Sequence, residues 1–114
     1  MSANVKIQNG SVLDLLSTST LVTGVFTGNF LPKVSPFSTF QAIINGTGAI
    51  TATVIIDCSN DGINACTTPL NTITLNGTTA TSDGFATTAS WKYVRARVTA
   101  VTGTISSIYV KMGV

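Results

Sequence analysis

Through residues 49–58, apolar and polar side chains alternate with a period of two. Successive side chains of a β-strand point to opposite faces, so this stretch has one face to bury and one to leave in solvent. Sustained helical periodicity is hard to find in the chain, and the structure is therefore predicted to consist of strands. One face carries Ile50, Ala52, Val54, Ile56 and Cys58, and the other carries Thr51, Thr53 and Asp57.

The same alternation occurs on both sides of two turn-like sequences. Asn45-Gly46-Thr47-Gly48 separates residues 39–45 from residues 49–58, and an Asn-Gly pair is typical of a tight hairpin. Residues 101–104 likewise stand between an alternating stretch at 93–100 and a last strand that ends near Met112. We therefore predict two β-hairpins. Gly-Thr pairs at 46–47, 77–78 and 103–104 are attributed to repeated hairpin chemistry.

Shorter stretches fill most of the remaining chain. Residues 12–16 are predicted as a strand, although they also fit one helical turn because leucine favours helix. Pro32 and Pro36 indicate a loop, since proline lacks the amide that a strand ladder needs. The other predicted strands are 5–8, 21–26, 70–75 and 79–86.

About seven to nine short strands separated by Gly, Asn and Asp turns predict an all-β fold, either an antiparallel β-sandwich or a jelly roll. The chain of 114 residues fits one domain over residues 1–114. Residues 1–10 are predicted to form an extended N-terminal arm. Within it, Ser2 to Gln8 can add a strand to the sheet edge of a neighbouring molecule.

The composition argues against catalysis. The chain has no histidine and no glutamate, the residues that most often transfer protons in active sites. Its four aspartates, Asp14, Asp57, Asp61 and Asp83, include no obvious catalytic pair. Twenty threonines, spread from end to end, instead suit outward faces of strands. We expect neither enzymatic activity nor a cofactor.

The charge pattern limits the partners of the chain. Charged residues make up 9% of the sequence, against about 25% in an average soluble domain, and the net charge is +2. This is too little positive charge to follow a nucleic-acid backbone. No apolar stretch is long enough to span a bilayer, and no secretory signal is recognised at the N-terminus, so synthesis in the cytoplasm is expected. No nucleic-acid or membrane partner is predicted.

The two cysteines, Cys58 and Cys66, flank a turn-rich segment. They either form a disulfide in an oxidising setting or remain reduced. Two thiols without histidine cannot supply the four ligands of a zinc site, and no metal site is predicted. Residues 57–62 match the start of a calcium loop, but Thr68 stands where that loop needs a glutamate. A turn held by its own Asn and Asp side chains is the favoured interpretation.

One cluster of side chains is a candidate contact site. Trp91 and Tyr93 are followed by Arg95 and Arg97, and alternation places both aromatic residues and the arginines opposite the apolar stripe that begins at Val94. Aromatic and arginine side chains are enriched in protein interfaces. A sugar-binding platform remains an alternative, as does a role for Trp91 in closing the end of the core.

Four motifs follow one another in the C-terminal half of the chain. They are Ser59-Asn60-Asp61-Gly62, Ile73-Thr74-Leu75-Asn76-Gly77-Thr78, Asp83-Gly84-Phe85, and the strand from Trp91-Lys92-Tyr93-Val94-Arg95 to Gly103-Thr104. In this order they resemble small β-sandwich virion proteins of tailed bacteriophages. The sequence departs from that pattern at Ile63-Asn64-Ala65-Cys66, where an aromatic residue is expected. The resemblance implies an accessory structural role in a phage particle.

The leading hypothesis from the sequence is a capsid decoration or cement protein on the exterior of the virion head. Copies would associate as trimers and bind the major capsid protein, with Trp91, Tyr93, Arg95 and Arg97 in contact. Binding only to the assembled shell would stabilise that shell by mass action. The alternatives are a structural protein of the tail, neck or fibre base, and a carbohydrate-binding module.

Overall fold

The computed structural model describes residues 12–18, 26–33 and 36–113 of the chain. The described residues form strands and connecting loops, without a helix, and none of them therefore forms a helix able to span a membrane. The all-β prediction is confirmed. In chain order the strands are β1 (Val12–Thr18), β2 (Phe26–Thr27), β3 (Leu31–Pro32), β4 (Ser38–Ser59), β5 (Asn71–Thr87) and β6 (Tyr93–Gly113).

All of the strand pairings are antiparallel and belong to one sheet. β4 lies between β5 and β6 and pairs with both along most of its length. On its other side, β6 pairs with β2 and β3 near its start and with β1 near its end. β4 is therefore the central strand, and β5 forms one border of the sheet.

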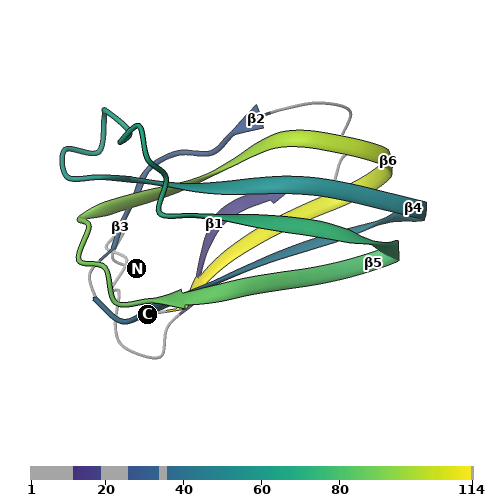
Figure 1. Ribbon diagram of the computed structural model, residues 1–114, viewed down its shortest axis with the longest axis horizontal. Coiled ribbons are helices and arrows are strands. Elements are labelled where there is room, and N and C mark those ends of the chain that lie inside the picture. Colours follow the sequence, from purple (N-terminus) through teal and green to yellow (C-terminus); the bar gives the residue numbers. More distant parts are fainter. Residues whose placement is uncertain (1–11, 19–25, 34–35, 114) are drawn as a thin grey trace, which may run out of the picture.

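β4, β5 and β6 are long because each of them bends in the middle instead of ending. In Figure 1 all three strands run to the right-hand end of the view, bend there and return. Each bend contains a residue with positive φ: Gly48 in β4 (70°), Thr79 in β5 (65°) and Gly103 in β6 (83°). Because the strand pairing continues on both sides of the bends, the whole sheet folds across one line. Each long strand thus contributes one arm to each of two facing halves.

The inward side chains of the two halves form a single hydrophobic core. Phe40 from the first arm of β4 stacks on Phe85 of β5, with ring centroids 4.9 Å apart. The inward positions keep the predicted alternation, including the stripe from Ile50 to Ile56. The fully enclosed residues of the core are Ala42, Ile44, Ile50, Val54, Ile56, Val94, Ala96, Val98, Ile105, Ile108, Val110 and Met112.

The two predicted hairpins are wrong. In β4, residues 39–45 pair with β5 and with the end of β6, whereas residues 51–59 pair with β5 and with the start of β6. The two arms of β4 do not pair with each other, because β5 and β6 occupy both sides of each arm. A bend needs the same small turn residues as a hairpin: a Cβ on Gly46 would lie 2.1 Å from the carbonyl oxygen of Thr104. The repeated Gly-Thr pairs therefore mark the bends.

Two further expectations change near the start of the chain. Residues 12–16 belong to strand β1, so the helical alternative is wrong; a register shift between Asp14 and Leu16 lets Leu15 and Leu16 both be buried. Pro32 stands in the short strand β3 instead of a loop, and proline is tolerated there because β3 borders the sheet.

The predicted number of short strands is reached only if the arms of the long strands are counted separately. The predicted arm at 1–10, with the strand at 5–8, and most of the predicted strand at 21–26 lie outside the described residues.

Candidate protein-contact surface

A buried carboxylate lies between the two arginines of the predicted contact site. Asp57 is on the outer face of β4, and its register partner on β6 is Arg95. Arg95 donates from Nε to Asp57 Oδ2 at 2.8 Å. Arg97 donates from Nε to Oδ2 at 2.9 Å and from Nη2 to Oδ1 at 3.0 Å. We call these three residues the Asp57 cluster.

The Asp57 cluster is held together by charge as well as by hydrogen bonds. Asp57 is only 2% exposed, while the two arginine side chains are 24% and 33% exposed. Burial alone would raise the pKa of Asp57, but the hydrogen bonds from Arg97 and Arg95 outweigh it and hold the pKa below its usual value. The same hydrogen bond raises the pKa of Arg97. The carboxylate is therefore ionised, and the cluster retains one net positive charge.

An aromatic ring covers part of the cluster. The guanidinium carbon of Arg95 lies 4.7 Å from the ring centroid of Phe30, which precedes β3. Such a cation–π contact adds to the ion pair and fixes the Arg95 side chain. Sequence reasoning missed the roles of Asp57 and Phe30, because alternation assigns Asp57 to an outer face but does not reveal which β6 residue lies opposite.

Tyr93 packs against the loop that follows β4. A Cβ built on Gly62 would lie 3.3 Å from the Tyr93 ring, so the ring covers the backbone of this loop. Asn60 Oδ1 accepts a hydrogen bond from the backbone N of Lys92 at 3.3 Å. Trp91 and Tyr93 are both half-buried. Tyr93 thus contributes to the packing of the loop and is not a freely exposed ring.

The side chain of Asp61 stabilises the same loop by accepting hydrogen bonds from the loop backbone. Its Oδ1 accepts hydrogen bonds from the backbone N of Ile63 at 2.9 Å and of Asn64 at 2.8 Å, and its Oδ2 accepts one from Asn64 Nδ2 at 2.8 Å. These bonds hold the pKa of Asp61 well below its usual range. The interpretation of this segment as a self-stabilised turn is confirmed. Among the described residues, no three acidic, cysteine or histidine side chains are grouped to hold a metal ion.

The structure brings the four predicted contact residues to one end of the molecule, at the start of β6 and just before it. Arg95 and Arg97 both donate hydrogen bonds to Asp57, and the ring of Tyr93 packs against the 59–65 loop. The side chains of Arg95, Arg97 and Tyr93 thus each have a partner within the molecule. A contact with another molecule through them stays a prediction.

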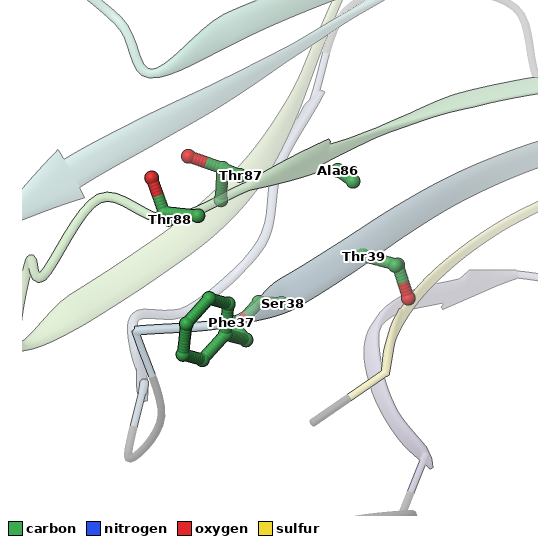
Figure 2. A pocket seen from close by; sticks show the side chains of 6 residues that line it. All are labelled: Phe37, Ser38, Thr39, Ala86, Thr87 and Thr88. Carbon is green, nitrogen blue, oxygen red and sulfur yellow. The ribbon is translucent and has the colours of Figure 1, made fainter.

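A shallow groove lies at the same end of the molecule, between the start of β4 and the end of β5 (Figure 1). Figure 2 shows the ring of Phe37 next to Ser38, across from Thr87 and Thr88 at the end of β5. Phe37 is 72% exposed and precedes β4 directly. One phenylalanine beside a proline has no recognisable sequence pattern, so this residue could not be predicted as part of a groove.

The two borders of the sheet differ in their exposure. Among the described strands, β5 pairs only with β4, and its outward side chains such as Thr72, Thr74 and Asn76 are exposed. The 17 residues of β5 include one charged side chain, Asp83, and no proline. Its other backbone edge is therefore open to a further strand.

Cys58 ends the buried stripe of β4, and Cys66 follows the loop. Both are unbonded thiols, Cys58 buried and Cys66 half-buried. The backbone N of Cys66 donates to the carbonyl oxygen of Cys58 at 2.9 Å, so the two residues are neighbours. A disulfide between them stays a prediction.

Comparison with known proteins gives a likeness of fold. No family model matches the chain, and a search of curated proteins gives no significant match. Among solved structures, the crystal structure of the PBSX exported protein XepA superposes with a TM-score of 0.59 at 15% sequence identity. The match covers 96% of this chain and 39% of XepA, so the chain spans about two fifths of that protein's length.

Proposed function

We propose that this protein is an accessory structural component of a bacteriophage particle, and specifically a decoration protein that binds the exterior of the assembled head. Its partners are the major capsid protein and further copies of itself, associated as trimers. Two independent likenesses support a phage origin: the motif order shared with small virion proteins and the fold shared with XepA, a phage product.

The observation that carries the proposal is the open edge of β5. β5 is a long edge strand without proline or lysine, and no described strand other than β4 pairs with it, so its outer edge is a ready site for another strand. Soluble monomers normally protect such an edge. A protein that functions in an assembly can leave it open for a partner.

The low charge of the outer surface supports the same role. Exposed positions of β5 are mainly threonine, serine and asparagine, so copies packed closely together repel one another weakly. The Asp57 cluster adds a rigid, weakly positive area on the outer face of β4 and β6, near the start of β5. Binding to the assembled shell alone stabilises that shell by mass action.

The proposal places the strongest contacts at β5 instead of at Arg95 and Arg97, because Asp57 already binds both arginines. The tail, neck or fibre base is the second candidate location, and the word "exported" in the name of XepA favours a position outside the head. The carbohydrate-binding alternative loses support, since the ring of Tyr93 packs on the loop at Gly62.

The decisive experiment measures where the protein is found and how many copies are present. Purified phage particles are separated into heads and tails, and the copy number in each fraction is measured by quantitative mass spectrometry. We expect the protein in heads, at a number comparable to that of the capsid subunits. Few copies, present only with tails, would contradict decoration and favour the second location.

A pair of variants tests the surface itself. Thr74→Lys places a charge on the edge strand β5, and we expect its affinity for heads to fall at least about tenfold, because a lysine on an edge strand discourages the addition of a further strand. Ser17→Lys places the same charge on an exposed position of β1 and serves as the matched control. Equal binding by both variants in a co-sedimentation assay would exclude the β5 edge. Trp91→Ala tests the carbohydrate alternative on a glycan array.

A further inference from the structure

The segment after the 59–65 loop returns alongside the end of β4. The backbone N of Cys66 donates to the carbonyl oxygen of Cys58 at 2.9 Å, and the backbone N of Leu70 donates to that of Ile56 at 2.8 Å. Cys58 Sγ also reaches the carbonyl oxygen of Thr68 at 3.8 Å. These contacts hold residues 66–70, which are not part of a strand, against the end of β4 and place Cys66 beside Cys58.

This backbone arrangement suits a covalent bond between the two side chains. The backbone hydrogen bond joins the two residues directly, and the Cys66 side chain lies close enough to hydrogen-bond with the Cys58 thiol, which is the proximity that a disulfide requires. Both residues are unbonded thiols. The loop between them is also held from outside, by Tyr93 against Gly62 and by Lys92 on Asn60.

We propose that Cys58 and Cys66 form an intramolecular disulfide when the protein meets a disulfide oxidant, and that this bond fastens the 59–65 loop to the end of β4. The inference goes beyond the proposed function, because it concerns a covalent modification site and holds for any location of the protein. The setting that supplies such an oxidant is outside the reducing cytosol of the host cell.

The two thiols differ in reactivity, which sets the order of the reaction. Cys58 is 2% exposed, and burial together with the neighbouring Cys66 thiol raises the pKa of Cys58 to about 11. Cys66 is half-buried and accessible to an oxidant. Because the thiolate is the attacking form, Cys66 reacts first.

With oxidised glutathione as the oxidant, each step balances. The Cys66 thiol loses its proton, and its sulfur attacks one sulfur of oxidised glutathione, forming a mixed disulfide and releasing one glutathione thiolate. Cys58 then loses its proton and attacks the Cys66 sulfur, which releases the second glutathione. The protein loses two protons and two electrons, and the glutathione disulfide is reduced to two thiols.

The test uses the full chain with oxidised glutathione and intact-mass spectrometry. We expect the wild-type protein to lose the mass of two hydrogen atoms without forming disulfide-linked dimers. Cys58→Ser should accumulate one glutathione on Cys66, whereas the matched variant Cys66→Ser should stay unmodified at the buried Cys58. Equal adducts on the two variants, a stable adduct on the wild type, no reaction, or disulfide-linked dimers would each overturn the proposal.

A second measurement on the wild-type protein avoids variants that fold poorly. Brief treatment of the native, reduced protein with iodoacetamide, followed by peptide mapping, should label Cys66 at least about tenfold faster than Cys58. Faster labelling of Cys58 would contradict the order of reaction. In the oxidised protein, the amides of Ile63 and Asn64 should exchange hydrogen more slowly, and reduction with dithiothreitol should reverse the change. Unchanged exchange would overturn the claim that the bond fastens the loop.

Discussion

β5 and β6 both pair with β4 along the folded sheet. Among the described strands, only β6 has further strands on its other side. On the far side of β6, the described residues supply β1, β2 and β3, and its outward arginines bind the carboxylate of Asp57. β5 has no such neighbour among the described strands.

The covered side also has the features that discourage strand addition. β1 has a register shift and an ion pair between Asp14 and Lys111 at 2.8 Å. β2 and β3 have two residues each, and β3 contains Pro32. Short strands, irregularities, charges and proline all protect sheet edges. Among the described strands these protective features are concentrated beside β6, whereas β5 contains no proline and one charged residue.

The largest effect on stability is expected from Asp57→Asn. The substitution removes the charge that both arginines contact and leaves two positive side chains beside each other, at a cost of about 3 kcal/mol in the free energy of unfolding. Urea denaturation at pH 7 measures the change. Asp83→Asn on the exposed surface of β5 is the matched control, with an expected change below about 0.5 kcal/mol.

The pH dependence of the stability gives a second test of the role of Asp57. Because the pKa of Asp57 is lowered in the folded protein, its contribution to stability is present above the unfolded pKa of about 3.9 and is lost as the pH falls through the folded pKa. The difference in stability between wild type and Asp57→Asn should therefore shrink in acid. A difference that is constant from pH 7 to pH 3 would contradict the role assigned to the carboxylate.

The bend of β6 should tolerate an added side chain less well than the bend of β4. Gly103 has a φ of 83°, and a Cβ there would lie 2.3 Å from the carbonyl oxygen of Ala49. A Cβ on Gly48 would meet nothing within 4 Å, although its φ is also positive. Gly103→Ala should destabilise the protein by about 2 kcal/mol more than Gly48→Ala, since both replacements have backbone strain but only the first has a steric clash. Equal thermal midpoints for the two variants would refute the close packing at this bend.

The smallest effect is expected at the bend of β5, where Thr79 has positive φ in place of a glycine. Thr79→Gly should raise the free energy of unfolding by about 0.5 kcal/mol, because relief of backbone strain slightly exceeds the added entropy of the unfolded chain. Thr78→Gly, at an exposed neighbour, lacks that relief and should lower the stability by a similar amount. Chemical denaturation of both variants gives the comparison, and a loss in both would argue against strain at Thr79.

Local patterns predicted the faces of the strands well and their connections poorly. The stripe from Ile50 to Ile56 is buried as alternation indicated, and the turn around Asp61 forms the hydrogen bonds that its residue types suggested. Asn45-Gly46-Thr47-Gly48 was interpreted as a hairpin because a reversal and a bend need the same small residues. Whether a hairpin or a bend is formed depends on β5 and β6, because these strands pair with both arms of β4.

The amino-acid sequence alone was enough to establish an all-β chain with alternating inward and outward residues and few groups suited to catalysis, because these properties depend on residues near one another in the chain. Only the tertiary structure revealed that Asp57 lies between Arg95 and Arg97, that three bends align across one sheet, and that β5 is the open border. Each of these depends on the register between strands distant in sequence, and the period of two is compatible with many registers.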